Sequence, residues 1–316
     1  MKKVDKYTYL GEVISDRGLS HSIVATINKR YGSAYKAIFE IKTIIEDVRS
    51  NVPGSFITAM KLWEMAVMPA LLNSAECWFQ MPVEATKKLN KLSQLFYSTV
   101  LQAGRNCPIA ALYWFTGSLL PANRIIQKKL LFLFHVTHLE SSCLAAEVLA
   151  AQQKLELRGL WSKCLEHMRE LDISVGELSS LSKFQFKTRV KEAIRERNAF
   201  QLLEQIKTYK KIDYLALKDE NFETKQYFFD MSLEKARMKF ALDTKMLKGV
   251  KMNFSSEPMY EDNLWQCNFC LRVESTRHIK NCPYFEEQRM NKNLNNDNDI
   301  ISYFQEVMII RIQEES

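Results

Sequence analysis

Glycine is scarce in this chain: only nine of its 316 residues are glycine. Glycine supplies most of the positive-φ backbone conformations that β-hairpins, phosphate-binding loops and dinucleotide-binding folds require. The glycine content lies well below the usual frequency of about 7%, so the chain has few places for such turns. The scarcity therefore predicts a mainly helical protein.

The overall composition is that of a globular protein. Apolar residues make up 47% of the chain and charged residues 26%, which excludes a disordered tail or a low-complexity polymer. No run of about 18 uncharged apolar residues is present that could cross a bilayer, and the stretch 130–134 is far too short to do so. No apolar signal core follows the basic start of the chain. We expect an intracellular protein, nuclear or cytoplasmic, without a signal peptide or a membrane partner.

Hydrophobic periodicity changes once along the chain. Residues 7–14 alternate β-forming side chains and meet a turn at 15–18, which predicts one or two short strands. After that, apolar residues recur at helical spacing, and Ser20 or Ser22 can cap the first helix. The helices expected from this spacing are 20–48, 55–78 with a kink at Pro69, one that follows Pro82, 121–139, 142–155, 160–171, 186–208, 233–247 and 300–312.

The net charge of +7 comes from one segment. Residues 182–251 contain 17 Lys and Arg against 10 Asp and Glu, whereas the rest of the chain is balanced. Lys187, Lys191 and Arg195 recur every four residues and would line one face of a helix. Such a stripe is either a solvated face whose cations pair with neighbouring glutamates or a surface that follows nucleic-acid phosphates, and the sequence leaves both open.

Four potential metal ligands are clustered near the C-terminus. Cys267, Cys270, His278 and Cys282 form the pattern C-x2-C-x7-H-x3-C. Three thiolates and one imidazole are a set that structural zinc prefers, and His278 and Cys282 have the spacing of one helical face. Because four protein ligands leave no position for water, the pattern predicts one structural zinc ion per chain. The alternative, a chance cluster of core cysteines, leaves the polar residues between the ligands unexplained.

Other reactive side chains form no catalytic arrangement in the sequence. His135 and His138 are three residues apart and are expected to pack or to lie on the surface. No small-molecule substrate and no catalytic residue is predicted. The remaining cysteines are far apart and are expected to be buried as small apolar residues: Cys77, Cys107, Cys143 and Cys164.

Three motifs follow one another in a definite order. They are Lys6-Tyr7-Thr8-Tyr9-Leu10-Gly11 before a basic helix, Ala75-Glu76-Cys77-Trp78 near the end of the second helix, and the Cys/His cluster followed by Pro283. In this order they resemble the C-terminal portion of a non-LTR (LINE-type) retrotransposon reverse transcriptase. The resemblance implies five parts: the end of the palm at 1–18, a thumb-like helical bundle at 19–103, a helical connector at 104–181, a basic helical region at 182–254, and a zinc module with a C-terminal helix at 255–316.

The chain differs from that family in the residues that polymerase catalysis requires. The family's palm holds two metal ions with aspartates, usually in an Asp-Asp motif, and this chain contains no Asp-Asp pair. We therefore expect a truncated reverse transcriptase that binds RNA or DNA, has no polymerase activity of its own, and has the missing polymerase half as a further partner.

The resemblance also implies which residues contact nucleic acid. Trp265, Phe269, Tyr284 and Arg289 would lie at the edge of the zinc module, where the aromatic rings could stack on bases or pack the module's core. Two alternatives stay open: a helical scaffold without enzymatic activity that binds proteins through the zinc module, and a decayed element without function. The basic residues expected to contact phosphates are Lys29, Arg30, Lys36, Lys87, Lys88, Lys91, Lys187, Arg189, Lys191, Arg195, Lys210 and Lys211.

Overall fold

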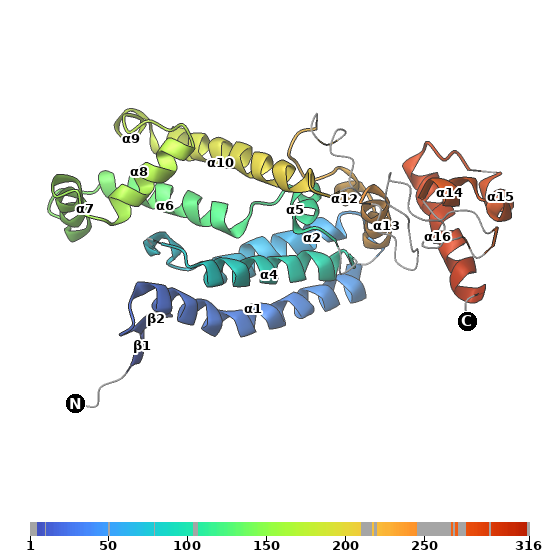
Figure 1. Cartoon of the computed structure of the whole chain (residues 1–316), viewed down its shortest axis with the longest axis horizontal. Coiled ribbons are helices and arrows are strands. Elements are labelled where there is room, and N and C mark those ends of the chain that lie inside the picture. The colour runs from blue at the N-terminus through green and yellow to red at the C-terminus, as the bar shows by residue number, and fades with distance from the viewer. Residues whose placement is uncertain are drawn as a thin grey trace. The chain divides into compact units, whose positions relative to one another are not determined.

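The computed structural model describes residues 5–9, 11–49, 51–78, 80–103, 107–209, 217, 220–244, 267, 269–270, 276–290 and 292–314. Two short antiparallel strands precede a long series of helices (Figure 1), which confirms the predicted, mainly α fold class. The chain forms two compact units, each assembled from three separate stretches. Unit 1 contains Met1–Ile41, Met60–Phe96 and Gly117–Leu202, and unit 2 contains Lys42–Ala59, Tyr97–Thr116 and Leu203–Ser316. The five-part organisation drawn from the resemblance stays a prediction.

Unit 1 contains both strands and most of the long helices. Its elements, some of which continue beyond the unit, are β1 (Lys6–Tyr9), β2 (Glu12–Ser15), α1 (Leu19–Arg49), η1 (Trp63–Val67), α3 (Met68–Leu71), η2 (Ala75–Cys77), α4 (Val83–Val100), α6 (Pro121–Thr137), α7 (Leu144–Lys154), α8 (Leu160–Glu170), α9 (Glu177–Ser180) and α10 (Lys183–Ile206).

The N-terminal hairpin is tied to the first helix by polar contacts. Tyr7 pairs with Ile14 in the antiparallel register, and Gly11 takes a φ of +84° in the connection, a conformation that favours glycine. The backbone N–H of Val13 donates to Thr26 Oγ1 (2.8 Å). Ser22 Oγ accepts from the N–H of Ser15 (2.9 Å), so this predicted cap residue holds strand β2 beside a helix that already begins at Leu19.

The second predicted helix, 55–78, is not one helix with a kink but a series of shorter segments. It begins as α2 (Ser55–Leu62), widens into the π-helical turn η1, and ends with α3 at Leu71. Pro69 explains the change, because it has no N–H to donate to the preceding turn and its ring crowds that turn. The segment up to Cys77 is then completed by a separate 3-10 turn, η2.

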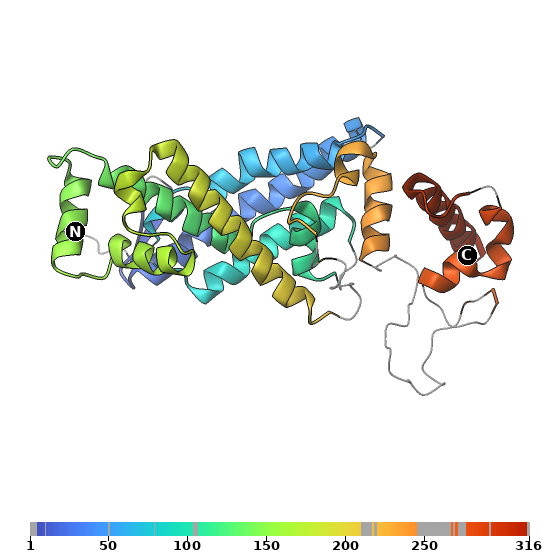
Figure 2. The ribbon, with the colours of Figure 1, turned by 90° about the horizontal axis from the view of Figure 1, so that it is seen from above.

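One apolar core of unit 1 lies among α6, α7, α8 and α10. Helices α6, α8 and α10 lie together in Figure 1, and Figure 2 shows the group from above. Leu133, Met168 and Val190 are buried here, and the rings of Phe134 and Phe186 stack at 4.7 Å. The structure thus packs the apolar faces of these predicted helices against one another.

One charged side chain is buried at this core. Lys129 is only 3% exposed, and Cys164 Sγ donates to the carbonyl oxygen of Lys129 (3.8 Å). Burial lowers the pKa of Lys129 to about 8 and raises the pKa of Cys164 to about 12. A neutral lysine is therefore accessible at mildly alkaline pH.

Unit 2 contains a helical part and a C-terminal module. Phe56 stacks on Phe228 at 4.2 Å, and Phe115 packs edge-on against Phe240. Among the described residues, no helix is both long and apolar enough to cross a membrane. The further elements of this unit are α5 (Ile109–Thr116), α12 (Tyr227–Asp230), α13 (Leu233–Asp243), α14 (Thr276–Asn281), η4 (Pro283–Phe285), α15 (Glu286–Arg289) and α16 (Asp297–Glu314).

Candidate metal centre and nucleic-acid interface

The four predicted metal ligands converge in the C-terminal module. The ligand atoms of Cys267, Cys270, His278 and Cys282 all lie within 4.8 Å of one another. The Sγ atom of Cys282 is 3.9 Å from that of Cys267 and 3.7 Å from that of Cys270, and Cys270 Sγ is 3.3 Å from His278 Nε2. These four side chains could hold a metal ion.

The separations have the size that a tetrahedral zinc site requires. Zn–S bonds of about 2.3 Å at tetrahedral angles give S–S separations of about 3.8 Å, and a Zn–N bond of about 2.0 Å gives S–N separations of about 3.5 Å. A disulfide would instead need a separation of about 2.05 Å between two sulfur atoms. The observed distances therefore match the first geometry and exclude a disulfide between the sulfur atoms measured.

Local sequence explains how one half of the site is formed. His278 lies on α14, but Cys282 follows the end of that helix with an extended backbone (φ −63°, ψ 126°). The prediction that one helix carries both residues is wrong for Cys282. Pro283 is the reason, because a residue before proline is disfavoured in the helical region. The turn of the chain still directs both side chains to the same point.

The surroundings of the Cys282 thiol oppose its ionisation. Cys267 and Cys282 are buried. Burial and hydrogen bonds with the neighbouring thiols Cys270 and Cys267 raise the pKa of Cys282 to about 12. A bound metal cation removes that obstacle by stabilising the thiolates. The chemistry of the donor set thus fits a site that is assembled around an ion.

Arg311 was not predicted from the sequence, yet it contacts the site. It is 6% exposed on α16, its Nη2 lies 3.9 Å from Cys267 Sγ, and its guanidinium lies over the ring of Phe269. A divalent ion with three thiolates and a neutral histidine has a net charge of −1, which this cation offsets. The only sequence signal was an arginine within an isoleucine-rich helical stretch.

Two further side chains connect parts of the module by hydrogen bonds. Tyr303 Oη donates to the carbonyl oxygen of Ile279 (2.6 Å). Arg289 Nη1 donates to the carbonyl oxygens of Lys280 (3.1 Å) and Cys282 (2.7 Å), so it closes the end of α14. Both residues connect later parts of the module to the segment that carries His278.

Of the aromatic residues expected at the edge of the module, one is packed against other rings and one is exposed. Phe269 packs against Tyr284 at 4.5 Å and Phe285 at 5.1 Å, consistent with a packing role, whereas Tyr284 is 49% exposed. Arg289 caps carbonyl groups as described above. Trp265 lies outside the described residues.

The basic stripe on α10 is exposed. Lys187, Lys191 and Arg195 all face solvent, and among the described residues no ion pair of Lys187 or Lys191 is found. Glu204, one of the glutamates that could have neutralised this helix, pairs with Lys207 instead. We call Lys187, Lys191 and Arg195 the α10 stripe.

Arg189 belongs to the same helix but has a different environment. Its guanidinium donates to the carbonyl oxygen of Asp172 (2.6 Å) and lies 3.5 Å from a carboxylate oxygen of Glu177. These contacts connect α10 to α9 and to the α8–α9 connection, so Arg189 is not part of the α10 stripe. Lys210 and Lys211, also predicted to contact phosphates, lie outside the described residues.

The predicted basic residues of α1 and α4 also divide into two groups. Arg30 is bonded to Glu12 (2.6 Å) and to the carbonyl oxygen of Asn73 (2.8 Å), so it holds the hairpin and the α3–η2 turn rather than facing solvent. Lys88 is paired with Glu84. The other four predicted residues are exposed: Lys29, Lys36, Lys87 and Lys91.

The remaining cysteines and histidines do not join the metal cluster. Cys107 and Cys164 are buried as predicted, but Cys77 is exposed and Cys143 is half-buried. His135 and His138 are exposed, and the ring of His138 stacks on Phe134 at 4.2 Å. Within the part of the chain that the structure describes, Cys267, Cys270, His278 and Cys282 form the one group of three or more side chains arranged to hold a metal ion.

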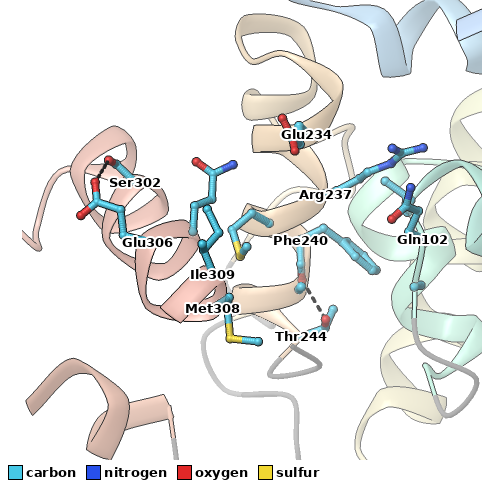
Figure 3. Close-up of a pocket in the computed structure, with 14 residues that line it drawn as sticks. Gln102, Glu234, Arg237, Phe240, Thr244, Ser302, Glu306, Met308 and Ile309 are labelled. Carbon is cyan, nitrogen blue, oxygen red and sulfur yellow. Dashed lines mark hydrogen bonds between the residues drawn. The ribbon is translucent and has the colours of Figure 1, made fainter. Parts of the chain in front are cut away.

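A cavity of about 660 Å³ lies between α13 and α16 (Figure 3). Its lining is largely apolar and includes Phe240 and Met308. Arg237 at its rim donates to a carboxylate oxygen of Glu46 (2.6 Å). Burial alone would raise the pKa of Glu46, but the hydrogen bond and charge of Arg237 outweigh it and lower the pKa. None of the predicted site residues lines the cavity.

Comparisons with known proteins identify no relative: the chain matches no family model, no curated protein and no solved structure.

Proposed function

We propose that this chain is a nucleic-acid-binding portion of a reverse transcriptase of the non-LTR retrotransposon type, without polymerase activity of its own. The observation that carries the proposal is the α10 stripe. It presents two lysines without ion pairs among the described residues, together with an exposed arginine, on one helical face. Such a surface attracts phosphates and releases their counterions on binding.

An exposed aromatic side chain lies in line with these cations. Phe184 is 77% exposed and precedes Lys187 by three residues on the same helix, a spacing that puts both on one face. Cations that contact phosphates beside a ring that can stack on a base are typical of surfaces that bind single-stranded nucleic acid. The α10 stripe therefore suits RNA or DNA better than an acidic protein surface, which offers nothing to stack.

We propose that the ion in the Cys/His cluster is zinc and that its role is structural. The donor set of three sulfurs and one nitrogen and the tetrahedral separations support zinc. With four protein ligands, no coordination position stays open for a catalytic water. In this proposal the zinc ion folds the module, and the module supplies no chemical step.

A salt titration with structured RNA and duplex DNA tests the function. Reversing Lys187→Glu and Lys191→Glu together should lower affinity for both and reduce the slope of log K against log salt by about 1.8 for duplex DNA. The matched control reverses Lys154 and Arg158, two exposed cations with the same four-residue spacing, and should change the slope little. Binding that is independent of salt, or equal in both double variants, would contradict the proposal.

The absence of polymerase activity has its own test. The purified chain, supplied with a primer on an RNA template, nucleotides and Mg²⁺, should not extend the primer, because no Asp-Asp pair is present to hold the two metal ions. Extension by the chain alone would show that the assignment of a non-catalytic portion is wrong.

A further inference from the structure

Three aromatic rings form a ladder along the solvent side of α1. Tyr31, Tyr35 and Phe39 are four residues apart, so they occupy successive turns of one helical face. The rings of Tyr31 and Tyr35 are 6.4 Å apart and nearly parallel, and those of Tyr35 and Phe39 are 5.1 Å apart. We call these residues the α1 ladder. The four-residue spacing of the three aromatic residues was the one signal for it in the sequence.

The ladder is open to solvent rather than part of a core. Tyr35 is 44% exposed and Phe39 40%, Tyr31 is half-buried, and the neighbouring Ile38 is fully buried. The opposite face of α1 thus already supplies the apolar contacts that hold this helix. Contiguous exposed rings are unusual on a soluble surface and mark a binding site more often than single exposed apolar residues do.

Positive charge borders the ladder. Lys36 follows Tyr35 and is highly exposed, with only a loose pair to Glu40 (3.8 Å). About one turn before Tyr31, Asn28 accepts a hydrogen bond from Lys88 of α4 (2.5 Å), a lysine that also pairs with Glu84. Lys91 is exposed three residues further along α4, on the side that carries Lys88.

This combination favours one kind of occupant. Partly exposed rings beside lysines match unpaired nucleobases on a phosphate backbone, since a base can stack on a ring while the lysines contact the phosphates. A duplex offers phosphates but keeps its bases stacked on one another. A protein partner would favour an interface core depleted of lysine.

We propose that the α1 ladder is a binding site for an unpaired stretch of RNA or DNA, which it holds by stacking bases on Tyr31, Tyr35 and Phe39. The proposal rests on the nucleic-acid function proposed above and adds a distinction to it. The α10 stripe supplies cations for the phosphates of single strands and duplexes alike, with Phe184 as a single ring beside them, whereas the α1 ladder offers three rings that only unpaired bases can use.

Fluorescence anisotropy with the full chain tests this distinction. The probes are labelled oligouridine, oligothymidine and a duplex of the same length, so that the arms separate RNA from DNA and single strands from duplex. Tyr35→Ala should weaken binding of the single strands about tenfold and leave duplex binding unchanged, because stacking contributes to affinity for unpaired bases only. The double variant Tyr31→Ala with Tyr35→Ala should lose more.

The salt dependence of binding and a second substitution at Tyr35 show whether an effect comes from lost stacking, from a change in charge or from misfolding. The slope of log K against log salt should be the same for Tyr35→Ala and the natural chain, since a ring releases no counterion. Tyr35→Trp should keep or strengthen binding because it keeps a stacking surface. The matched control is Phe200→Ala, which removes a ring that is 66% exposed on α10 and lies outside the ladder, and it should change neither affinity.

Photocrosslinking locates the contact directly. An oligonucleotide that contains 5-iodouracil should attach to the tryptic peptide that spans 31–36, because cleavage after Arg30 and Lys36 leaves Tyr31 and Tyr35 in one short peptide. Crosslinks confined to peptides from α10 would overturn the proposal.

The outcomes distinguish the two proposals. Unchanged single-strand affinity in the Tyr31→Ala, Tyr35→Ala double variant, with affinity lost when Lys187 and Lys191 are reversed, overturns the ladder and keeps the general function. Loss of single-strand and duplex binding to the same extent in Tyr35→Ala also overturns the ladder. If the natural chain binds none of the probes, both proposals are wrong.

Discussion

The core among α6, α7, α8 and α10 and the core of the Cys/His module differ in what they are made of. The first is formed by aliphatic and aromatic side chains such as Leu133 and Phe134. Among the described residues, the second has fewer than half as many buried residues, and two of them, Cys267 and Cys282, belong to the cluster that could hold a metal ion. One region buries apolar surface on several helices, and the other gathers short elements and one face of α16 around four potential ligand atoms.

The difference teaches where each region obtains its stability. A core built from helices that carry long apolar stripes can be stable through burial alone. A small module rarely gains more than about 3–5 kcal/mol from its core and needs a cross-link or a metal ion in addition. We therefore expect metal removal to unfold the module alone, and a cavity in the apolar core to destabilise the helical region alone.

Loss of the metal should unfold the module and spare the helical core. The variant Cys270→Ser, or prolonged chelation, removes a ligand or the ion on which folding of the module depends. We expect loss of hydrogen-exchange protection in α14 and α16, unchanged protection in α6 and α10, and a fall from about one zinc ion per chain to much less, measured by exchange mass spectrometry and elemental analysis.

The control for this experiment is another cysteine. Cys77 is exposed and lies outside the metal cluster, so Cys77→Ser should keep the zinc ion and the protection of both regions. If α16 kept its full hydrogen-exchange protection in metal-free Cys270→Ser, the module would be stable without the ion, and the proposed difference between the two regions would be wrong.

A cavity in the helical core should have the reverse effect. Leu133 is fully buried, and Leu133→Ala should lower the free energy of unfolding of this region by about 2–5 kcal/mol. Zinc content should stay unchanged. Leu144→Ala, at a position that is 74% exposed, is the matched control and should cost less than about 0.5 kcal/mol in denaturant unfolding. Similar losses in both variants would show that the assigned core is wrong.

The buried lysine should make the helical core depend on pH. Its pKa is lowered from 10.5 to about 8 on folding, so between these pH values the unfolded chain binds more protons than the folded one, and stability rises with pH. Relative to Lys129→Met, the natural chain should gain about 2 kcal/mol between pH 7 and pH 10 in denaturant unfolding. A constant difference between the two proteins across this range would contradict the pKa shift.

The smallest expected effect concerns Arg311. Replacing it with Met keeps most of the apolar contact with Phe269 but removes the cation beside Cys267, and zinc affinity should fall about tenfold in competition with a chelator. Arg311→Lys keeps the charge and should lie between the two. Equal zinc affinity in all three proteins would show that the contact has no influence on the metal.

The sequence predicted those features that depend on periodicity or on a compact motif. Alternating residues predicted the strands, apolar spacing predicted α1 and α10, and the C-x2-C-x7-H-x3-C pattern predicted a metal cluster whose ligands the structure brings together. Each of these signals lies within a few turns of the chain, where the spacing alone decides which side chains share a face.

Other features could not be predicted because they depend on distant partners. Helix α5 is apolar on every side, since Ala110 to Thr116 are all buried, and a helix without a polar face shows no amphipathic period. Arg30 looked like a phosphate contact until Glu12 and a distant carbonyl oxygen were found to accept its hydrogen bonds. Arg311 needed the fold to place α16 against a cysteine 44 positions earlier in the chain.

The assembly of unit 2 from three separate stretches has a consequence for protein synthesis. Glu46 and Arg237, which form an ion pair, are 191 positions apart in the chain. At ribosomal rates of about 5–20 residues per second, the first partner waits roughly 10 to 40 seconds for the second. During that interval Phe56 and its neighbours are without the side chains that later cover them, so a nascent chain of this protein offers a long-lived apolar target to chaperones and to aggregation.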